Sequence, residues 1–259
     1  MPELEVVAML VVAAGFAGWI DAIVGGGGLI QLPALVLGVP KDVPTPYVLG
    51  TNKVSSFSGT LVASWLYVKK LRVELVVLLP LILGAFAGSA TGASVSRYLP
   101  REIVTPIVLV AVVLVGAYMI WKPSLGIDHR PTARGVGAAV RAGIVGLIVG
   151  LYDGLLGPGT GSFFLILIVI LLGHGFLQAS VHAKLANLTT NVAAIIIYGI
   201  HGEILLLLAL CMGAANIAGG IIGANMAISG GNAFVRRVLI IVLALITITL
   251  GIETVRTFT

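Results

Sequence analysis

Residues 18–28 read Gly-Trp-Ile-Asp-Ala-Ile-Val-Gly-Gly-Gly-Gly, and residues 150–161 read Gly-Leu-Tyr-Asp-Gly-Leu-Leu-Gly-Pro-Gly-Thr-Gly. Each stretch places an acid and a glycine cluster in otherwise apolar sequence. A lysine follows each of them, Lys53 in the first case and Lys184 in the second. Glycine clusters interrupt helices, and ionisable groups at membrane depth are costly. Because this costly combination occurs twice, it predicts the binding site of a membrane transporter.

The composition places the chain in a membrane. Of its 259 residues, 59% are hydrophobic and only 10% are charged, whereas soluble domains have about 25% charged residues. The net charge of +5 comes from basic residues scattered between apolar segments, which is typical of loops that set membrane topology and not of a nucleic-acid surface. The single Cys211 excludes an internal disulfide and a cysteine metal site.

Apolar runs predict an all-α integral membrane protein. The predicted spans are Leu4–Val24, Pro46–Val68, Val73–Ser96, Ile103–Trp121, Val136–Leu156, Phe176–Ile200, Ile204–Ile228 and Phe234–Val255. Two shorter apolar pieces, Leu29–Val39 and Ser162–Gly173, follow the glycine clusters. At 1.5 Å per residue, such a piece reaches only about half the depth of a bilayer.

The chain repeats itself. Gly18, Asp21, Gly25 and Gly27 match Gly150, Asp153, Gly157 and Gly159 at one offset, and Lys53, Ala63, Tyr67, Gly88, Gly92 and Ala93 match Lys184, Ala194, Tyr198, Gly219, Gly223 and Ala224 at a second. We expect two homologous repeats of about four helical segments each, at residues 1–121 and 135–259, joined by a polar linker at 122–134.

Two topologies remain open. If each glycine break makes a re-entrant hairpin, each half crosses the membrane an odd number of times and the halves are inverted. Most basic residues then fall on the cytoplasmic side, among them Lys69, Lys70, Arg72, Arg134, Arg141, Arg236 and Arg237. If the first segment of each half simply crosses, both termini lie inside and the charge bias is weaker. The stronger bias favours the inverted repeat.

The two lysines and the two glycine breaks are predicted to meet near the middle of the membrane. From the loop near Val39, the short piece climbs about 15 Å to its glycine cluster, and the next helix climbs about 10 Å to Lys53. A broken helix exposes backbone N–H groups and the positive end of its dipole. An ammonium group beside such ends favours a small anion. The predicted substrate-binding residues are Gly25, Gly26, Gly27, Gly28, Thr51, Asn52, Lys53, Gly157, Gly159, Thr160, Gly161, Lys184, Asn187, Thr190 and Asn191.

The two acids allow more than one role. A carboxyl group in apolar surroundings can carry a proton, which makes Asp21 and Asp153 candidates for proton coupling. The alternative is that they cap helices beside the glycine breaks. Each lysine, in turn, has an alternative to anion binding, namely a salt bridge between Lys53 and Asp21 or between Lys184 and Asp153.

The glycine motifs also have two interpretations. Gly84, Gly88 and Gly92 recur every fourth residue, as do Gly219 and Gly223, so each set puts small residues on one helix face. Such a face packs against another helix of the same chain or forms a subunit interface. Internal packing is favoured, and a homodimer stays open.

The same residues resemble a known family. Gly25–Gly28 followed by Pro33, the run Gly50–Lys53, Gly157–Gly161 followed by Phe163, and Ala183–Asn187 with Thr190-Asn191 are similar to the sulfite exporter TauE/SafE family, also called the TSUP permeases. The resemblance covers nearly the whole chain, roughly residues 10 to 255, including its duplicated layout. It implies a multi-pass permease of the bacterial inner membrane that moves small sulfur-containing or organic anions such as sulfite, sulfoacetate or thiosulfate.

These observations lead to one functional expectation and two alternatives. We expect a secondary transporter coupled to protons or to the membrane potential, with a small anion and lipid as its partners and with no cofactor, metal or nucleic acid. A passive anion channel would use the same residues. An intramembrane enzyme is disfavoured because Asp21 and Asp153 stand alone in separate halves, without a clustered metal motif or a nucleophile with its base.

Overall fold

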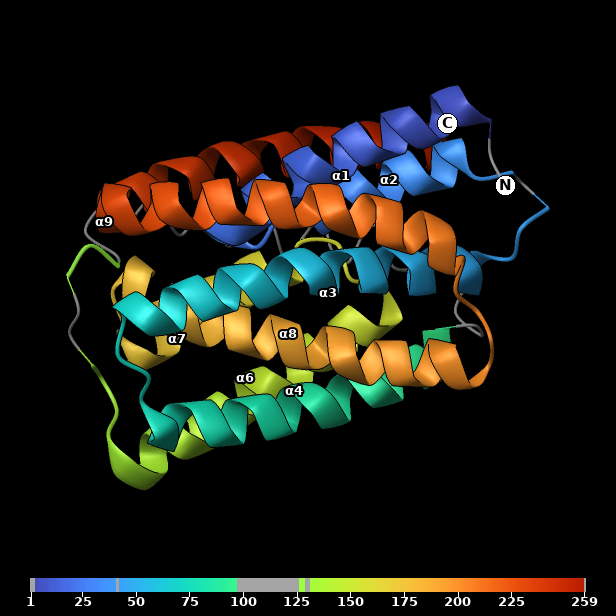
Figure 1. The fold of residues 1–259 in the computed structure, drawn as a ribbon. Helices are drawn as coiled ribbons and strands as arrows, with labels where there is room; N and C mark the ends of the chain where they lie inside the picture. Colours follow the sequence, from blue (N-terminus) through green and yellow to red (C-terminus); the bar gives the residue numbers. More distant parts are fainter. Residues whose placement is uncertain (1–2, 41, 97–125, 129–130, 259) are drawn as a thin grey trace.

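The computed structural model describes residues 3–40, 42–96, 126–128 and 131–258. Within these ranges the chain forms only helices and their connections, so the predicted all-α class is confirmed. The helices are α1 (Leu4–Val24), α2 (Gly28–Gly38), α3 (Thr45–Lys70), α4 (Leu75–Val95), α6 (Gly135–Leu155), α7 (Thr160–Leu172), α8 (Phe176–Ile200) and α9 (Leu206–Phe258) (Figure 1). The predicted span Ile103–Trp121 and part of the linker lie outside the described residues.

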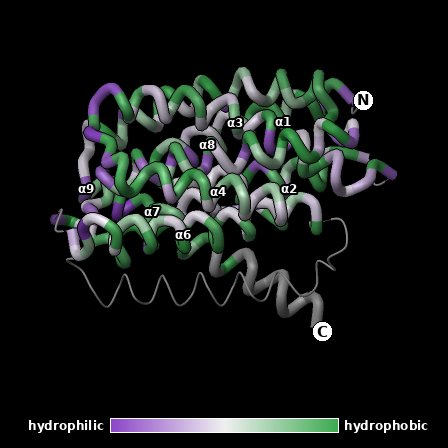
Figure 2. The backbone as a smooth tube through the Cα atoms, turned by 90° about the horizontal axis from the view of Figure 1, so that it is seen from below, coloured by the Kyte–Doolittle hydropathy of each residue, from purple (hydrophilic) through white to green (hydrophobic). Residues whose placement is uncertain are grey.

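The helices have the length and composition of membrane spans. Among the described residues, five helices are long and apolar enough to cross a bilayer, which agrees with a multi-pass membrane protein. Large apolar side chains such as Leu83 and Val136 are exposed, at 70% and 79%, as they are when lipid is the solvent. Figure 2 shows hydrophobic residues along most of the helices, with hydrophilic residues gathered mainly toward the ends of the bundle and along interior stretches.

Helix α9 contains the last two predicted spans. Gly231 interrupts it with non-helical angles (φ 65°, ψ −167°), which an L side chain rarely adopts. This break falls between the predicted spans Ile204–Ile228 and Phe234–Val255, so the chain turns where the sequence predicts a loop.

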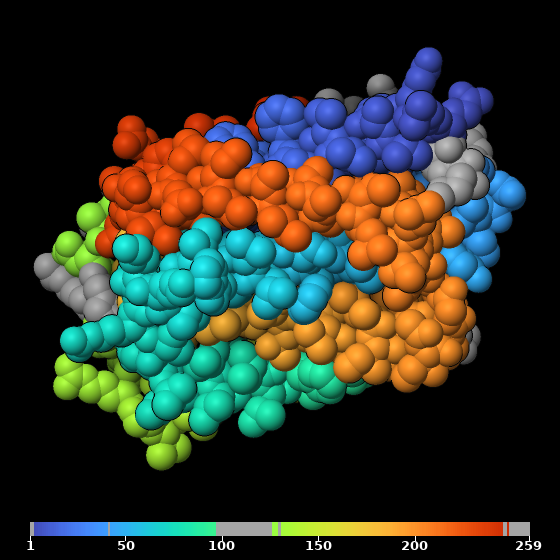
Figure 3. Space-filling model, in the orientation of Figure 1, coloured from blue at the N-terminus to red at the C-terminus, as the bar shows by residue number. Residues whose placement is uncertain are grey.

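The two halves of the chain interleave. Helix α1 packs along α9, and α6 packs along α4, so the first helix of each half lies against a helix of the other half. On the face shown in Figure 3, α1 (blue), α9 (orange), α3 (cyan), α8 (light orange) and α4 (green) follow one another, alternating between the first and the second half. Neither half forms a separate globule.

The glycine motifs make this interleaving close. A side chain at Gly88 would collide with the backbone of α6 at Leu147, and one at Gly219 would collide with the backbone of α1 at Gly15. Small residues let helix backbones approach in this way. The favoured interpretation, packing inside one chain, is therefore what the described residues show for both motifs.

Helices α3 and α8 are corresponding segments of the two halves, and they run antiparallel. Near the start of α3, a side chain at Gly50 would touch Tyr198 at the end of α8. At the other end, Gln178 near the start of α8 donates a hydrogen bond to the carbonyl oxygen of Arg72, just after α3. The basic segments at the end of α3 and at the start of α6 therefore lie at one end of the bundle (Figure 1).

Each short helix turns back along the helix before it. A side chain at Gly38, at the end of α2, would lie 3.0 Å from Val6 near the start of α1. In the second half, Arg141 near the start of α6 donates a 2.9 Å hydrogen bond to the carbonyl oxygen of Leu171 at the end of α7. Both glycine breaks are consequently placed inside the bundle, away from its ends.

Candidate functional site

The two glycine breaks touch each other. Helix α1 ends at Gly25 in the left-handed conformation (φ 80°), and the backbone of Gly25 lies directly against that of Gly161 at the start of α7. Ser162 fixes this contact, because its backbone N–H donates to the Gly25 carbonyl oxygen (3.3 Å) and its hydroxyl donates to that of Val24 (2.8 Å). No side chain fits between the two breaks.

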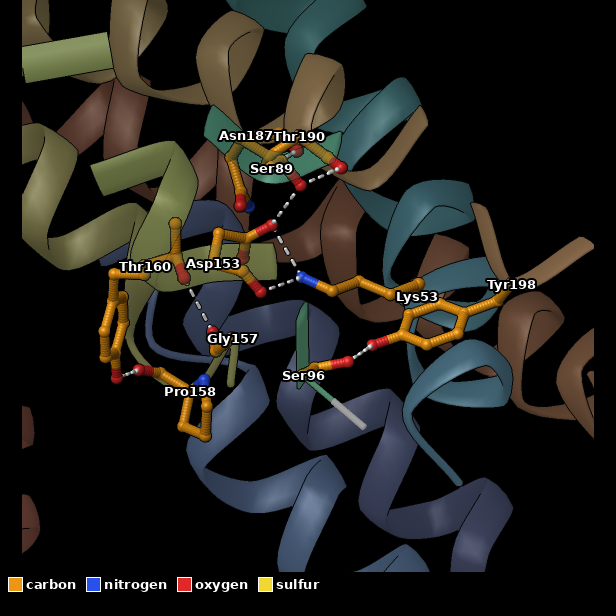
Figure 4. A network of polar contacts seen from close by, with 11 residues as sticks. Lys53, Ser89, Ser96, Asp153, Gly157, Pro158, Thr160, Asn187, Thr190 and Tyr198 are labelled. Carbon is orange, nitrogen blue, oxygen red and sulfur yellow. Dashed lines mark hydrogen bonds and ion pairs between the residues drawn. The ribbon is translucent and has the colours of Figure 1, made fainter. Parts of the chain in front are cut away.

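Each lysine pairs with the acid of the other half. Lys53 Nζ lies 2.6 Å from Asp153 Oδ2 and 3.1 Å from the Asp153 carbonyl oxygen (Figure 4). Lys184 Nζ lies 3.2 Å from Asp21 Oδ2 and also donates to the Asp21 carbonyl oxygen. All four residues are buried, with exposures of 8% or less. The residues of the two pairs correspond at the two offsets found in the sequence.

The broken helices explain where the ammonium groups sit. Asp21 lies in the last turn of α1, and Asp153 lies in the last turn of α6. The final carbonyl groups of a helix have no intrahelical partner and carry the negative end of its dipole. Each lysine thus satisfies both a carboxylate and a helix C-terminus, which offsets part of the cost of burying its charge.

The pairings within one half, which were the alternative to anion binding, are not formed. Lys53 contacts Asp153 in place of Asp21, and Lys184 contacts Asp21 in place of Asp153. The reason is the interleaving of the halves, which brings the end of α6 to α3 and the end of α1 to α8. The capping alternative for the acids is not seen either, because no side chain caps the described N-termini of α2 and α7.

A small polar cavity lies between the breaks. It is lined by Asp21, Gly25, Gly28, Asn52, Lys53, Ser56, Asp153, Gly157, Thr160, Gly161, Asn187 and Asn191. All of these except Ser56 were predicted from the sequence as binding or coupling residues. The space left for the centre of a water molecule is about 20 Å³, enough for roughly one water. The cavity is therefore small in this conformation.

Six predicted binding residues lie beside the cavity without lining it. Gly26, Gly27 and Gly159 belong to the breaks but pack against apolar or backbone atoms. Thr51 donates to the Tyr47 carbonyl oxygen (2.6 Å) and accepts from the Leu205 N–H (3.0 Å). The remaining two are Lys184, which is engaged by Asp21, and Thr190, which donates to the Asn187 carbonyl oxygen. The positions of these six residues allow them to support the glycine breaks and helix α8.

One cavity residue has an unused donor. Asn191 is 2% exposed, and its Nδ2 has no hydrogen-bond partner among the described residues. A buried NH₂ group without a partner costs about 1–3 kcal/mol. Since Asn191 lines the cavity, a ligand that accepts hydrogen bonds would remove this cost.

Hydroxyl groups support the two acids. Thr60 donates to Asp21 Oδ2 at 3.2 Å. Ser89 lies 3.5 Å from Asp153 Oδ2 and donates to the Thr190 carbonyl oxygen at 2.8 Å (Figure 4). Neither hydroxyl was predicted as a site residue, because small hydroxyl residues are common on packed membrane helices and carry no distinct pattern.

A second polar cluster joins three helices, and of its members only Asn52 was predicted. Gln31 (α2), Asn52 and Ser55 (α3) and Asn216 (α9) are all 4% exposed or less. Gln31 Nε2 donates to Asn52 Oδ1 at 2.9 Å, and Gln31 Oε1 accepts from Asn216 Nδ2 at 2.7 Å. A signal was present in the sequence, since an amide residue such as Gln31 is rare in so apolar a segment.

Comparison with known proteins gives a consistent result. Residues 10–250 match the family described as Sulfite exporter TauE/SafE. The chain is 34% identical to "Probable membrane transporter protein ORF9" of Sinorhizobium sp, over 92% of this chain and 89% of that protein. It is 32% identical to "Probable membrane transporter protein" of Haemophilus influenzae, over 94% of both chains. It is 30% identical to "Probable membrane transporter protein YfcA" of Escherichia coli, over 92% of this chain and 87% of that one. No solved structure matches the chain.

Proposed function

This chain belongs to the sulfite exporter TauE/SafE family of membrane transporters, and from that premise we propose that it is a secondary transporter for small sulfur-containing or organic anions. Sulfite, sulfoacetate and thiosulfate represent the substrate class. The substrate site is the cavity between the two glycine breaks, and the site residues are those predicted from the sequence. The relatives found are transporters and not enzymes.

The observation that carries this proposal is the set of donors around the cavity. Lys53 supplies an ammonium group, and Asn191 supplies an NH₂ group that has no partner among the described residues. Gly28 and Thr160 open α2 and α7, so two helix N-termini begin at the cavity wall. Helix N-termini favour negative charge. A small oxyanion accepts from all of these groups.

The arrangement of the halves supports an inverted repeat. Helices α3 and α8 run antiparallel, and α2 and α7 each turn back along the preceding helix. With residues 1–121 and 135–259 as the repeats, α2 and α7 are re-entrant pieces that reach the same depth from opposite faces. Transporters built this way alternate access by moving one repeat against the other around a central site.

Charge balance supports coupling of anion transport to protons. The cavity region holds two lysines and two acids, so it is neutral when both ion pairs are formed. An arriving anion adds uncompensated negative charge at membrane depth, which is costly. If a singly charged anion takes Lys53 from Asp153, protonation of the released carboxylate restores neutrality, whereas a doubly charged anion requires a second proton, for which Asp21 is the other acceptor. Anion and proton then move together.

The size of the cavity supports the same sequence of events. The space left for the centre of a water molecule, about 20 Å³, is small for an anion of four heavy atoms. In the proposed sequence of events, the Lys53–Asp153 contact opens as the anion binds.

A thermal-shift screen of the purified protein tests the proposal. The ligands are sulfite, sulfate, thiosulfate, sulfoacetate, taurine and small carboxylates. We expect at least one anion to raise the Tm of the wild type. The comparison protein is Lys53→Met/Asp153→Asn, which removes both charges of one pair and leaves no buried charge alone. Equal shifts in both proteins, or no shift with any anion, contradict the proposed site.

Flux measurements separate the transporter from a passive channel. Proteoliposomes loaded with the stabilising anion are exposed to an inward or an outward pH gradient. Coupled transport predicts that the gradient drives the anion against its own concentration difference. Flux that only dissipates the anion gradient, whatever the pH difference, identifies a channel.

A further inference from the structure

The two halves of the site differ in one respect that the repeat makes visible. Gln31, Asn52, Ser55 and Asn216, here called the amide cluster, are joined by hydrogen bonds. At the two offsets that relate the halves, the corresponding residues are Phe163, Ala183, Ala186 and Ala85. All four counterparts are apolar. The corresponding helices α7, α8 and α4 therefore pack without polar groups at these positions.

Burial makes the amide cluster costly unless it serves the site. Gln31 is fully buried, and Asn216 is 2% exposed. Buried amides that have apolar counterparts in the same fold are not needed for packing, since well-packed apolar groups of similar shape are often as stable. Asn52 is the member that lines the cavity, which links the cluster to the ligand.

The hydrogen bonds fix which end of each amide in the cluster is the NH₂ group. Gln31 Nε2 lies 3.2 Å from the backbone carbonyl oxygen of Asn52, and a carbonyl oxygen only accepts. The group facing it is therefore the NH₂ end of Gln31. The same NH₂ donates to Asn52 Oδ1 at 2.9 Å. The other end, Oε1, accepts from Asn216 Nδ2 at 2.7 Å and from Ser55 Oγ at 3.3 Å.

This orientation of the Gln31 amide determines which end of the Asn52 amide faces the cavity. Because Oδ1 of Asn52 is taken by Gln31, its Nδ2 is the end of the amide left for the cavity. An amide with its NH₂ group toward a ligand binds an anion, whereas its oxygen would repel one. Without Gln31, the Asn52 amide would be free to turn over.

We propose that Gln31 is a positioning residue for anion binding, which holds the Asn52 amide with its NH₂ group toward the cavity. The site is then asymmetric: α2 and α3 of the first half, together with α9 of the second, orient a donor, and the corresponding positions in α7, α8 and α4 hold only apolar residues. This inference rests on the proposed anion site and adds to it the group that contacts the anion's oxygen atoms beside Lys53.

Gln31→Leu is the first variant, and Gln31→Glu is the second. The Glu side chain has the shape of Gln, but when ionised it only accepts, so the Asn52 amide has to turn its NH₂ group away from the cavity. We expect each variant to weaken binding of the stabilising anion about tenfold, the equivalent of one hydrogen bond. The probe is the anion that gives the largest thermal shift with wild type, measured by isothermal titration.

A double-mutant cycle separates positioning from a structural role. If Gln31 acts through Asn52, Gln31→Leu/Asn52→Ala binds the anion no more weakly than Asn52→Ala alone. The matched control is Phe163→Leu, the counterpart position of the second half, which we expect to keep wild-type affinity. Additive losses in the cycle, or an equal loss in Phe163→Leu, overturn the inference.

A variant with an apolar residue at every position of the amide cluster guards against misfolding. Gln31→Leu/Asn52→Ala/Ser55→Ala/Asn216→Ala removes the whole amide cluster and leaves no member without its partner. We expect it to keep the wild-type Tm without ligand and to lose about tenfold in anion affinity. Wild-type affinity in this variant overturns the role of Gln31 while the anion site stands. Absence of anion binding in wild type itself overturns both proposals.

Discussion

Lys53 Nζ lies 2.6 Å from Asp153 Oδ2 although 100 residues separate them in the chain. The contact joins α3 of the first half to the end of α6 in the second, and the Lys184–Asp21 pair repeats it with the halves exchanged. Two such crossed pairs tie the halves together at the point where both helices break. Any motion of one half against the other has to pull on these pairs.

The first prediction concerns the charges of one pair. Lys53→Ala leaves Asp153 buried without its cation, and we expect a loss of about 3–5 kcal/mol in stability. Lys53→Met/Asp153→Asn removes both charges and is expected to recover most of that stability. Both variants should lose anion binding. Thermal unfolding with and without ligand measures the two effects, and anion binding retained by the double variant would refute the role of Lys53.

The second prediction concerns coupling. Asp153→Asn keeps the Lys53 ammonium but removes the carboxylate that we propose accepts a proton when the anion binds. We expect this variant to bind the anion at least as tightly as wild type, because the competing carboxylate is gone. It should no longer use a pH gradient to concentrate the anion in proteoliposomes. Wild-type coupling in Asp153→Asn would assign the proton to another group, with Asp21→Asn as the next variant.

The third prediction concerns the contact between the breaks. The backbone of Gly161 lies against that of Gly25, so Gly161→Ala forces them apart. Overpacking of this kind costs about 1–3 kcal/mol, and it also displaces the cavity wall. Gly137→Ala is the control, because a methyl group there meets nothing within 4 Å. We expect a lower Tm and weaker anion binding in Gly161→Ala and not in Gly137→Ala. Similar behaviour of both variants would contradict the close contact between Gly25 and Gly161.

The fourth prediction is that one substitution at Asn191 raises stability and lowers affinity for the anion. Asn191→Leu replaces a buried NH₂ group that has no partner among the described residues with an apolar side chain of similar size. Without ligand, we expect the variant to gain about 1–3 kcal/mol in stability. Its affinity for the anion should fall because a donor is lost. A Tm series over anion concentration reports both quantities, and a variant less stable than wild type would show that the NH₂ group is used in the empty state.

Much of the fold was predicted from residue type and spacing. The predicted span Leu4–Val24 coincides with α1, and Phe176–Ile200 coincides with α8. Long apolar runs in lipid have little choice but to form helices, since every backbone group has to be satisfied within the segment. The glycine clusters correctly marked the ends of α1 and α6, because their backbone angles exclude other residues at Gly25 and Gly157.

Most residues that line the cavity were predicted from the sequence, but the pairings of the charged residues were not. Eleven of the twelve residues lining the cavity came from the sequence, and Ser56 did not. Lys53 and Asp21 are rare charges in one apolar half, which made them visible. Gln31 was missed because its role depends on Asn52 and Asn216, which lie on other helices.

By itself, the sequence determined the class of protein, the described helices and most of the residues that line the cavity, because each of these follows from composition or from spacing along one chain. Only the tertiary structure decided which lysine meets which acid and which amide faces the cavity. The reason is the interleaving of α1 with α9 and of α6 with α4. Close packing of the glycine faces brings side chains of the two halves into contact. The spacing of residues within one half does not predict such a contact.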